Sequence, residues 1–370
     1  MEGSEKQITK TQLFCLIIIT GLASAVLALP SVLAAEAGRD LWLSALTGFA
    51  VYAVIFFIIV RIYKLNPDAG LYTVIQKNLG SLGAKIIYGL LALFFGFKTL
   101  MLFCETEEFC AARLYDGLPW YFYAAVLGAL AVFMAVKGLK TIARCNELSL
   151  VFVIAALLVC ISAAAGQMEP ARLFPVLEKG FAPVFRSFYK TAAWYGDFLI
   201  ILMAMGKIKP DKKLPRVLYA AYGAAAVIAA AFCFVYYALY GKLSGFQGHG
   251  EALPNIINFS KDSSMGLISA AFNQIWLLAC FLKLTAMFWA ANEALGKAAG
   301  LKKPVYTAPP LAAVLYILNI FVFKNIDAVI YAALKYASYF TAGVCFILPP
   351  VILICAARYK KRRERGAWDI

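Results

Sequence analysis

The sequence predicts an all-α membrane protein that crosses the bilayer ten times. Hydrophobic residues make up 63% of the 370 residues and charged residues only 15%, whereas soluble domains are roughly 45–50% apolar and about 25% charged. A single water-soluble core also stops growing near ~250–300 residues, so no soluble fold could bury this much apolar side chain. The apolar residues form runs of about 20, the length that crosses about 30 Å of hydrocarbon. Basic residues gather in the short segments between these runs.

Ten apolar runs meet this length criterion. The first has Lys residues ahead of it, as a signal peptide has, but it is long, contains Pro30 and leads straight into further runs, so we interpret it as a span. The predicted spans are 12–35, 41–62, 83–112, 119–137, 146–166, 187–206, 215–241, 265–294, 305–324 and 328–356.

The connections between the spans are too short for a further folded unit, so residues 1–370 form a single integral membrane domain. The two long connections are 166–186 and 242–264. Pro and Gly alternate with apolar residues in the first of them, which predicts a short helix lying on the membrane surface.

Alternate connections are much richer in Lys and Arg than those between them, which orients the chain. The positive-inside rule then places both termini in the cytoplasm. The formal charge of +15 follows from this asymmetry, and the sequence lacks the contiguous basic face that a nucleic-acid partner requires. We interpret the basic tail 357–370 as a contact with anionic membrane lipid.

Four ionisable residues lie near the middle of predicted spans. An ionisable group at mid-depth costs ~2.5 kcal/mol or more and normally faces the interior of a helix bundle in a pair. The charges of the four sum to zero, so we expect one paired interior cluster that serves either as a static link or in binding. Glu107, by contrast, is expected in the outer headgroup region. The cluster is Lys98, Glu105, Asp197 and Lys283.

The ten spans divide into two sets of five, at about 12–166 and 187–356. The odd number gives the halves opposite orientations, as in the inverted repeats of secondary transporters. Spans one and six, the first of each half, carry Gly21 and Gly196 near mid-depth. Matching interruptions of this kind indicate broken helices whose free backbone groups bind a ligand. The alternative is that both glycines allow close helix packing. The predicted ligand-binding residues are Gly21, Leu22, Ala23, Ser24, Trp194, Tyr195, Gly196 and Asp197.

Two segments resemble the permease-like B subunits of spore germinant receptors. The first holds Ile8–Gln12, Gly21, Pro30 and the run Ala37–Ser44. The second, 173–208, is similar in its Phe-Pro pair, its following glycine and its Gly-acidic pair, although the family often has Glu where this chain has the shorter Asp.

That family belongs to the amino acid–polyamine–organocation superfamily. The resemblance implies a nutrient sensor in the inner membrane of a bacterial spore that works with separate receptor A and C subunits. The ligand is then a small nutrient, expected to be an amino acid.

Two functions remain open from the sequence. The first is a germinant receptor subunit that binds its nutrient between the broken spans and signals germination. The second is an amino-acid transporter coupled to protons through Asp197 or Glu105. An enzyme is not expected, because the one histidine, His249, lies in a Gly-rich loop and the sequence contains no HExxH or nucleotide-binding motif. The nine cysteines form no CxxC pair, so neither a metal nor a cofactor is expected.

The topology is open to a direct test. A cysteine in the connection 207–216, for example Lys212→Cys, should resist an impermeant thiol reagent added from outside the cell, whereas a cysteine within 166–186 should react. Strong outside labelling at Lys212→Cys would contradict the ten-span arrangement. The other connections expected inside are 61–85, 137–145 and 297–304.

Overall fold

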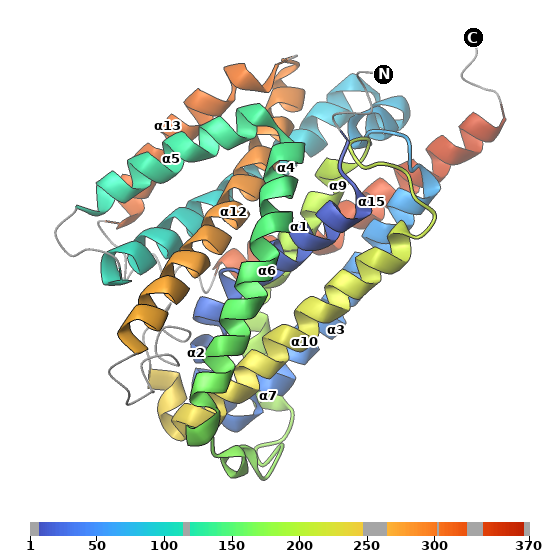
Figure 1. The fold of residues 1–370 in the computed structure, drawn as a ribbon. Coiled ribbons are helices and arrows are strands. Elements are labelled where there is room, and N and C mark those ends of the chain that lie inside the picture. Colours follow the sequence, from blue (N-terminus) through green and yellow to red (C-terminus); the bar gives the residue numbers. More distant parts are fainter. Residues whose placement is uncertain (1–6, 114–118, 247–264, 302, 324–335, 366–370) are drawn as a thin grey trace.

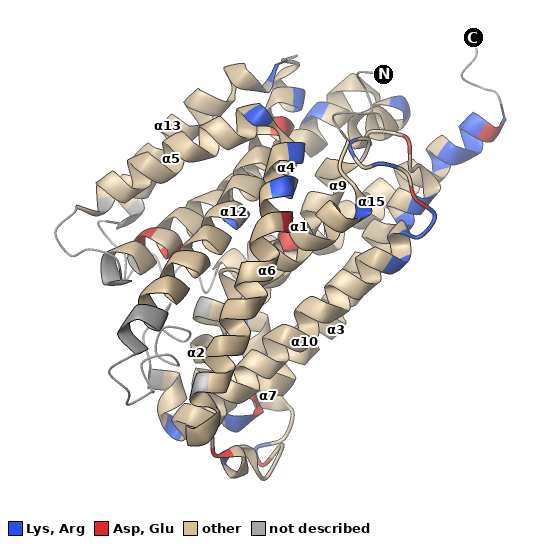
Figure 2. Cartoon of the chain, viewed as in Figure 1, with Lys and Arg blue, Asp and Glu red and all other residues tan. Residues whose placement is uncertain are grey.

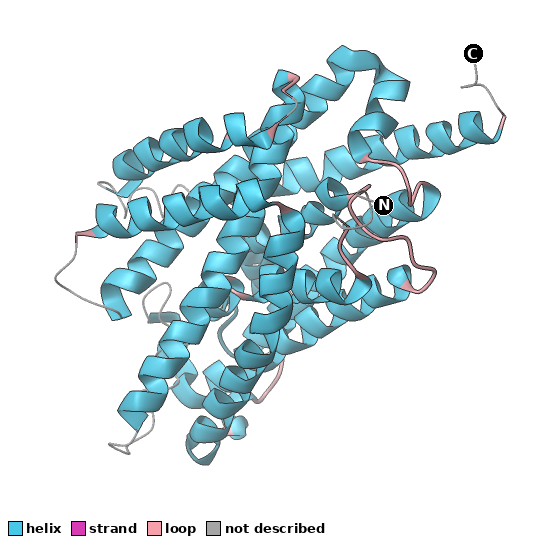
Figure 3. Ribbon diagram, turned by 45° about the horizontal axis from the view of Figure 1, so that its top comes forward, coloured by secondary structure: helices cyan, strands magenta, loops and turns pink. Residues whose placement is uncertain are grey.

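The protein is a bundle of long helices, and a computed structural model describes residues 7–113, 119–246, 265–301, 303–323 and 336–365 (Figure 1). Helices account for nearly all of these residues (Figure 3), and the one extended pairing among them is an isolated bridge between Ile8 and Ile208. The all-α prediction is confirmed for this part of the chain. The segments 247–264 and 324–335, which include most of one predicted loop and the start of the tenth predicted span, lie outside the described residues.

The helices follow the predicted spans in order along the chain. Their bounds are α1 Lys10–Leu22, α2 Ala25–Ala37, α3 Leu41–Leu65, α4 Leu71–Arg113, α5 Trp120–Lys137, α6 Leu139–Ala164, α7 Ala182–Lys190, α8 Ala192–Tyr195, α9 Ile200–Ala204, α10 Leu214–Tyr240, α12 Met265–Ala299, α13 Ala308–Phe323 and α15 Ser338–Glu364.

Among the described residues, six helical stretches are long and apolar enough to cross a membrane, and four further apolar helices are shorter, at 10–17 residues. The short ones are Lys10–Leu22, Tyr121–Lys137, Ala192–Ala204 and Ala308–Phe321. An integral membrane protein is therefore supported by length and composition, while the count of ten spans and the division into two repeats stay predictions.

Large apolar side chains lie on the outer surface of the bundle, where lipid tails can solvate them. Phe57 on α3, Leu93 on α4, Val151 on α6 and Phe321 on α13 are all well exposed. A soluble protein rarely exposes so much contiguous apolar surface, whereas lipid tails solvate it without cost. The interior is formed around α12, of whose most apolar stretch 72% is buried, packed lengthwise against α4.

The segment 61–85 was predicted as a loop, but most of it is helical. Helix α3 continues to Leu65 and α4 begins at Leu71, leaving only a short turn between them. Helix α4 then breaks at Gly80, whose φ of 73° lies in the left-handed region that favours glycine. A short helical segment therefore precedes the apolar part of α4, and its polar residues had suggested a loop.

In the connection 166–186, where a short surface helix was predicted, helix α7 begins only at Ala182 and continues to Lys190. Helix α7 packs against α2 and α3. The loop before it is fixed by the Leu177 amide, which donates to the Asp40 carboxylate over 2.9 Å, and by an ion pair of 3.1 Å between Arg39 and Glu178. The face of α7 that carries Phe181 and Phe185 remains exposed.

Lysine and arginine gather at the end of the bundle where the described chain starts and finishes (Figure 2). We call it the basic end, and it carries Lys64, Lys207 and Arg358. Helix α15 extends beyond the other helices at this end (Figure 1), so its charged last turns are exposed.

Candidate ligand site

The first broken helix is interrupted over two residues, Ala23 and Ser24, which separate α1 from α2. The side chains of α12 satisfy the polar groups at this break. The Trp276 indole N–H donates to the Ala23 carbonyl over 3.0 Å, and the Lys283 ammonium donates to the Ser24 hydroxyl over 2.8 Å. A helix break buried in a membrane protein persists only when its free backbone groups find such partners.

The predicted break was too wide, because Gly21 and Leu22 belong to α1. A Cβ atom on Gly21 would lie 3.2 Å from the Phe198 ring and 3.6 Å from Ala225. The glycine therefore allows close helix packing, as the alternative interpretation held.

The second interruption is a tightening of the helix and not an unwinding. Trp194 and Tyr195 form the last turn of the short helix α8, and Gly196 and Asp197 begin a 3-10 turn, η5, which spans Gly196–Leu199. A 3-10 turn bonds each residue three positions ahead and is often found where a helix is under local strain. The predicted position of the interruption, Trp194 to Asp197, is correct. The prediction that the helix unwinds there is wrong, because it tightens into a 3-10 turn.

Gly196 is also held in close contact with α15. A Cβ atom there would lie 2.6 Å from Thr341 Cγ2 and 3.0 Å from Cys345 Sγ. Contacts below 3.0 Å force atoms to move, so any larger residue would push η5 away from α15.

Asp197 is the centre of a buried charge cluster. Its Oδ1 lies 2.5 Å from Lys98 Nζ on α4, and its Oδ2 lies 2.6 Å from Lys283 Nζ on α12. Lys98 also donates to the main-chain carbonyl of Ala193. The exposed fraction is 1% for Asp197, 1% for Lys283 and 7% for Lys98. A carboxylate with two ammonium partners thus joins three helical segments in the interior.

Glu105 completes the cluster on α4. Its carboxylate lies near Ser24 and within electrostatic range of Lys283. Its Oε2 atom is buried and has no hydrogen-bond partner. The four charges sum to zero, so the cluster adds no net charge to the membrane interior.

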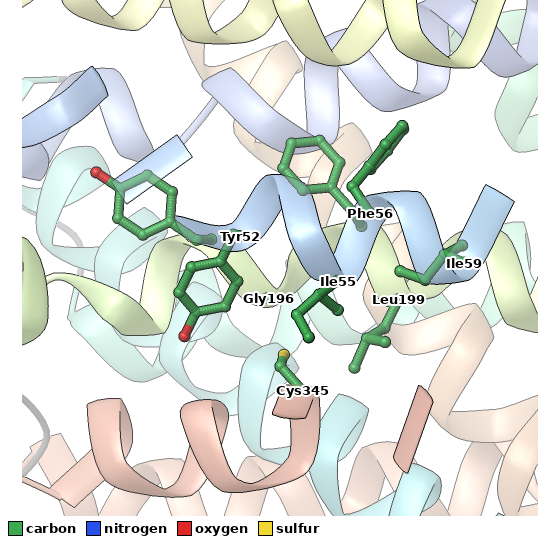
Figure 4. Close-up of a pocket in the computed structure, with 9 residues that line it drawn as sticks. Tyr52, Ile55, Phe56, Ile59, Gly196, Leu199 and Cys345 are labelled. Carbon is green, nitrogen blue, oxygen red and sulfur yellow. The ribbon is translucent and has the colours of Figure 1, made fainter. Parts of the chain in front are cut away.

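A cavity of about 10 Å³ adjoins η5 on the side of α3 and α15 (Figure 4). Ile55 and Leu199 point toward Cys345 across it (Figure 4). This volume holds no more than about one water molecule, so a nutrient requires movement of the surrounding helices. The full lining is Tyr52, Ile55, Phe56, Ile59, Tyr195, Gly196, Phe198, Leu199 and Cys345.

Glu107, which was expected at the depth of the headgroup region, is buried between helices. The residue is 0% exposed, and both of its carboxylate oxygens lie 2.8 Å from Asn319 Nδ2 on α13. The Asn319 carbonyl oxygen in turn accepts from Cys104 Sγ over 3.1 Å. The sequence did contain a signal for this contact, because Asn319 is a polar amide inside the apolar run of span nine.

The segment before α1 closes the basic end. The Ile8 amide donates to the Lys207 carbonyl over 2.9 Å. Ion pairs of 2.8 Å join Lys207 to Glu293 and Lys10 to Asp211. The hydrogen bond from Lys10 lowers the pKa of the Asp211 carboxyl.

Helices broken near mid-bundle are typical of the class of secondary-transporter folds. Three solved transporters have this fold at low sequence identity. A Na⁺-coupled sialic acid symporter in its substrate-bound outward-open state gives a TM-score of 0.66, with 9% identity over 95% of this chain and 78% of the other. MhsT in complex with L-phenylalanine gives 0.65, with 12% identity over 94% and 91%. Mhp1, a nucleobase-cation-symport-1 family transporter, gives 0.64, with 12% identity over 95% and 78%.

The sequence places the chain more narrowly within this class. It belongs to the spore germination protein family, whose model matches residues 7–247. It is also 22% identical over 365 residues, 97% of both chains, to spore germination protein KB of Bacillus subtilis. The resemblance stated from the sequence is therefore confirmed.

The ion pairs of Asp197 predict a specific pattern of stability. Asp197→Asn leaves two buried ammonium groups without their carboxylate, and we expect a loss of about 3–5 kcal/mol. Changing Lys283→Met as well should recover part of the loss, measured as membrane protein level and Tm in detergent. The exposed pair gives the control, because Asp211→Asn should cost less than about 1 kcal/mol. A double variant no more stable than Asp197→Asn would contradict the pairing.

The amide of Asn319 should stabilise the protein mainly through its contact with Glu107. Asn319→Leu leaves a buried carboxylate without its donor, and we expect a loss of about 3 kcal/mol in the free energy of unfolding. Replacing Glu107→Leu together with Asn319→Leu should be less harmful than Asn319→Leu by itself. Thermal unfolding of the purified variants measures both, and simple additivity of the two changes would refute the interaction.

Proposed function

We propose that this chain is the permease-like B subunit of a spore nutrient-germinant receptor. It binds a small nutrient, an amino acid, between its two broken helices and signals germination. Membership of the spore germination protein family supports the receptor role, and the transporter fold supports a site for a small molecule at the helix breaks.

The observation that carries the ligand assignment is the charge cluster beside the first break. Asp197 and Glu105 supply carboxylates, and Lys98 and Lys283 supply ammonium groups. An amino acid carries one group of each kind, so it exchanges for an internal pair without leaving a net charge in the membrane. Ser24 accepts a hydrogen bond from Lys283 and lies near Glu105, so an exchange of partners would begin there.

Signalling follows from a shift in the population of bundle conformations. A ligand shifts such an equilibrium only by its difference in affinity for the two states. The closed interior seen beside η5 is then one state, and a nutrient favours a second in which α15 has moved away from Gly196. We propose that receptor A and C subunits detect this movement, and that the protein lies in the spore inner membrane with both termini and the basic end in the cytoplasm.

The alternative is an amino-acid transporter coupled to protons. The buried Oε2 atom of Glu105, which has no hydrogen-bond partner, is the observation in its favour. Uptake of a radiolabelled amino acid into vesicles containing the purified chain decides between the two functions. Accumulation driven by a pH gradient would establish transport, and binding without accumulation would favour sensing.

Ser24→Ala tests the receptor proposal in spores. Loss of the hydrogen bond to Lys283 should raise the nutrient concentration for half-maximal germination about tenfold, since a hydrogen bond to a charged group contributes about 1.5–3 kcal/mol. The measurement is release of spore contents against amino-acid concentration, with the protein level checked in parallel.

Ser31→Ala is the matched control, because this buried hydroxyl bonds only to the Ala28 carbonyl of its own helix. It should leave the response unchanged. If deletion of the chain leaves the response to every amino acid intact, the receptor proposal is wrong.

A further inference from the structure

The last turns of α15 form a strongly basic surface at the basic end. Six Lys and Arg side chains are exposed there, and the one acidic side chain among them, Glu364, lies 3.6 Å from Lys360. Figure 2 shows this stretch as a largely blue run where α15 extends beyond the other helices. A surface of one sign attracts partners of the opposite sign. The basic residues are Arg358, Lys360, Lys361, Arg362, Arg363 and Arg365.

Most of this surface lies too far from the hydrocarbon for lipid headgroups to cover it. Among the described residues of α15, the last large apolar side chain that is well exposed is Ile354, which marks the edge of the hydrocarbon. Arg363 lies nine residues further on, about 14 Å along a helix that rises 1.5 Å per residue. The headgroup region adds only about 5–8 Å on each side of the hydrocarbon. The sequence suggested a lipid contact for this tail, but its reach into water favours a protein partner.

Contacts with the turn between α3 and α4 hold this part of α15 in place. The side-chain amide of Asn66 donates to the Ala356 carbonyl over 2.9 Å. The side-chain amide of Asn78, near the start of α4, donates to the Cys355 carbonyl over 2.9 Å. Both acceptors are main-chain atoms, so the position of the helix does not depend on its exposed side chains. The basic surface is therefore carried on a fixed support.

Two prolines separate this part of α15 from the part that contacts Gly196. Pro349 and Pro350 lie inside the helix. Each removes a main-chain hydrogen bond, so a helix bends most readily at such a point. Thr341 and Cys345, the contacts of Gly196, precede the prolines. The half of α15 beside η5 can therefore move while the basic half stays in place.

We propose that the exposed last turns of α15 dock an acidic segment of a second protein on the cytoplasmic side of the membrane. Asp and Glu side chains of that segment pair with the Lys and Arg side chains of α15. Because the basic half of α15 is held to α3 and α4, the partner stays bound in both states of the bundle. The biological meaning rests on the proposed receptor, in which this partner is another receptor subunit.

The test uses the purified full chain in nanodiscs of zwitterionic lipid. The probe is a fluorescent peptide of repeated Glu-Ala units, and anisotropy measures its binding. The wild type should bind the peptide, and added salt should weaken the binding. Lys361→Glu with Arg363→Glu should weaken it by about tenfold or more, because close charge pairs contribute strongly to association.

The matched control is Lys212→Glu with Lys213→Glu. These lysines are exposed, precede α10 at the same end of the bundle, and change the net charge by the same amount. The control should change the affinity less than about twofold, because it alters only the screened long-range field at α15. An equal loss in the two double variants would overturn the proposal, and so would a wild type that does not bind the peptide at low salt.

The folding of both double variants is checked by Tm in detergent. All four substitutions replace exposed side chains, so Tm should stay close to that of the wild type. If the glutamate variant of α15 does not accumulate, Lys361→Gln with Arg363→Gln replaces it. The control is then Lys212→Gln with Lys213→Gln, and the same comparison decides.

Anionic lipid is the competing occupant, and a fluorophore on Arg363→Cys measures its approach. In nanodiscs of anionic lipid, this fluorophore should be quenched by iodide in solution and not by a nitroxide on the lipid headgroup. A fluorophore on Ile354→Cys of the same helix is the control, and the headgroup nitroxide should quench it. Strong headgroup quenching at Arg363→Cys would mean that lipid covers the surface, and the proposal would be wrong.

The receptor setting is tested separately. A receptor A subunit produced together with this chain should co-purify with the wild type equally well with and without amino acids. About tenfold less should co-purify with Lys361→Glu and Arg363→Glu. Loss of the A subunit on adding amino acids would contradict docking at a fixed support. If the A subunit never co-purifies with the wild type, the receptor proposal is wrong, and peptide binding alone decides the docking surface.

Discussion

The contact of Asp197 with two lysines is the interaction on which the arrangement of the interior depends. It joins η5 to α4 and to α12, the helix around which the interior packs. The same Lys283 extends the connection to Ser24 at the break between α1 and α2. These contacts hold both broken helices to α4 and α12. A change in the ion pairs of Asp197 therefore affects all of these helical segments together.

The two interruptions beside the charge cluster are each matched by a partner on another helix. The carbonyl freed at Ala23 is bound by Trp276, and the carbonyl of Ala193 by Lys98. Lipid offers no hydrogen bonds, so an interruption without such a partner would not persist. The breaks are therefore a property of the assembled bundle, since the sequences of α1 and η5 alone do not provide the partners.

Much of the fold followed from the sequence, because apolar runs of sufficient length have few alternatives to membrane helices. The four interior charges were also visible, since an ionisable residue in an apolar run has to face the bundle interior. The assignment of Asp197 as one of the ligand-binding residues stays a prediction. The burial of Glu107 could not be predicted from its depth along one helix, because burial is decided by a neighbour, here Asn319 on α13. The exact form of the helices around Gly21 and Gly196 depended on contacts with Phe198 and Thr341, which no local pattern contains.

The backbone bridge between Ile8 and Ile208 gives the two broken helices a shared anchor. Ile8 leads directly into α1, and the segment that pairs with it follows directly from α9. The hydrogen bonds are made by main-chain atoms, so side-chain substitution cannot easily remove them. The two helices are thus joined to each other at the basic end. They can move apart most at the opposite end. Access to the interior should accordingly be asymmetric, opening away from the basic end before it opens toward it.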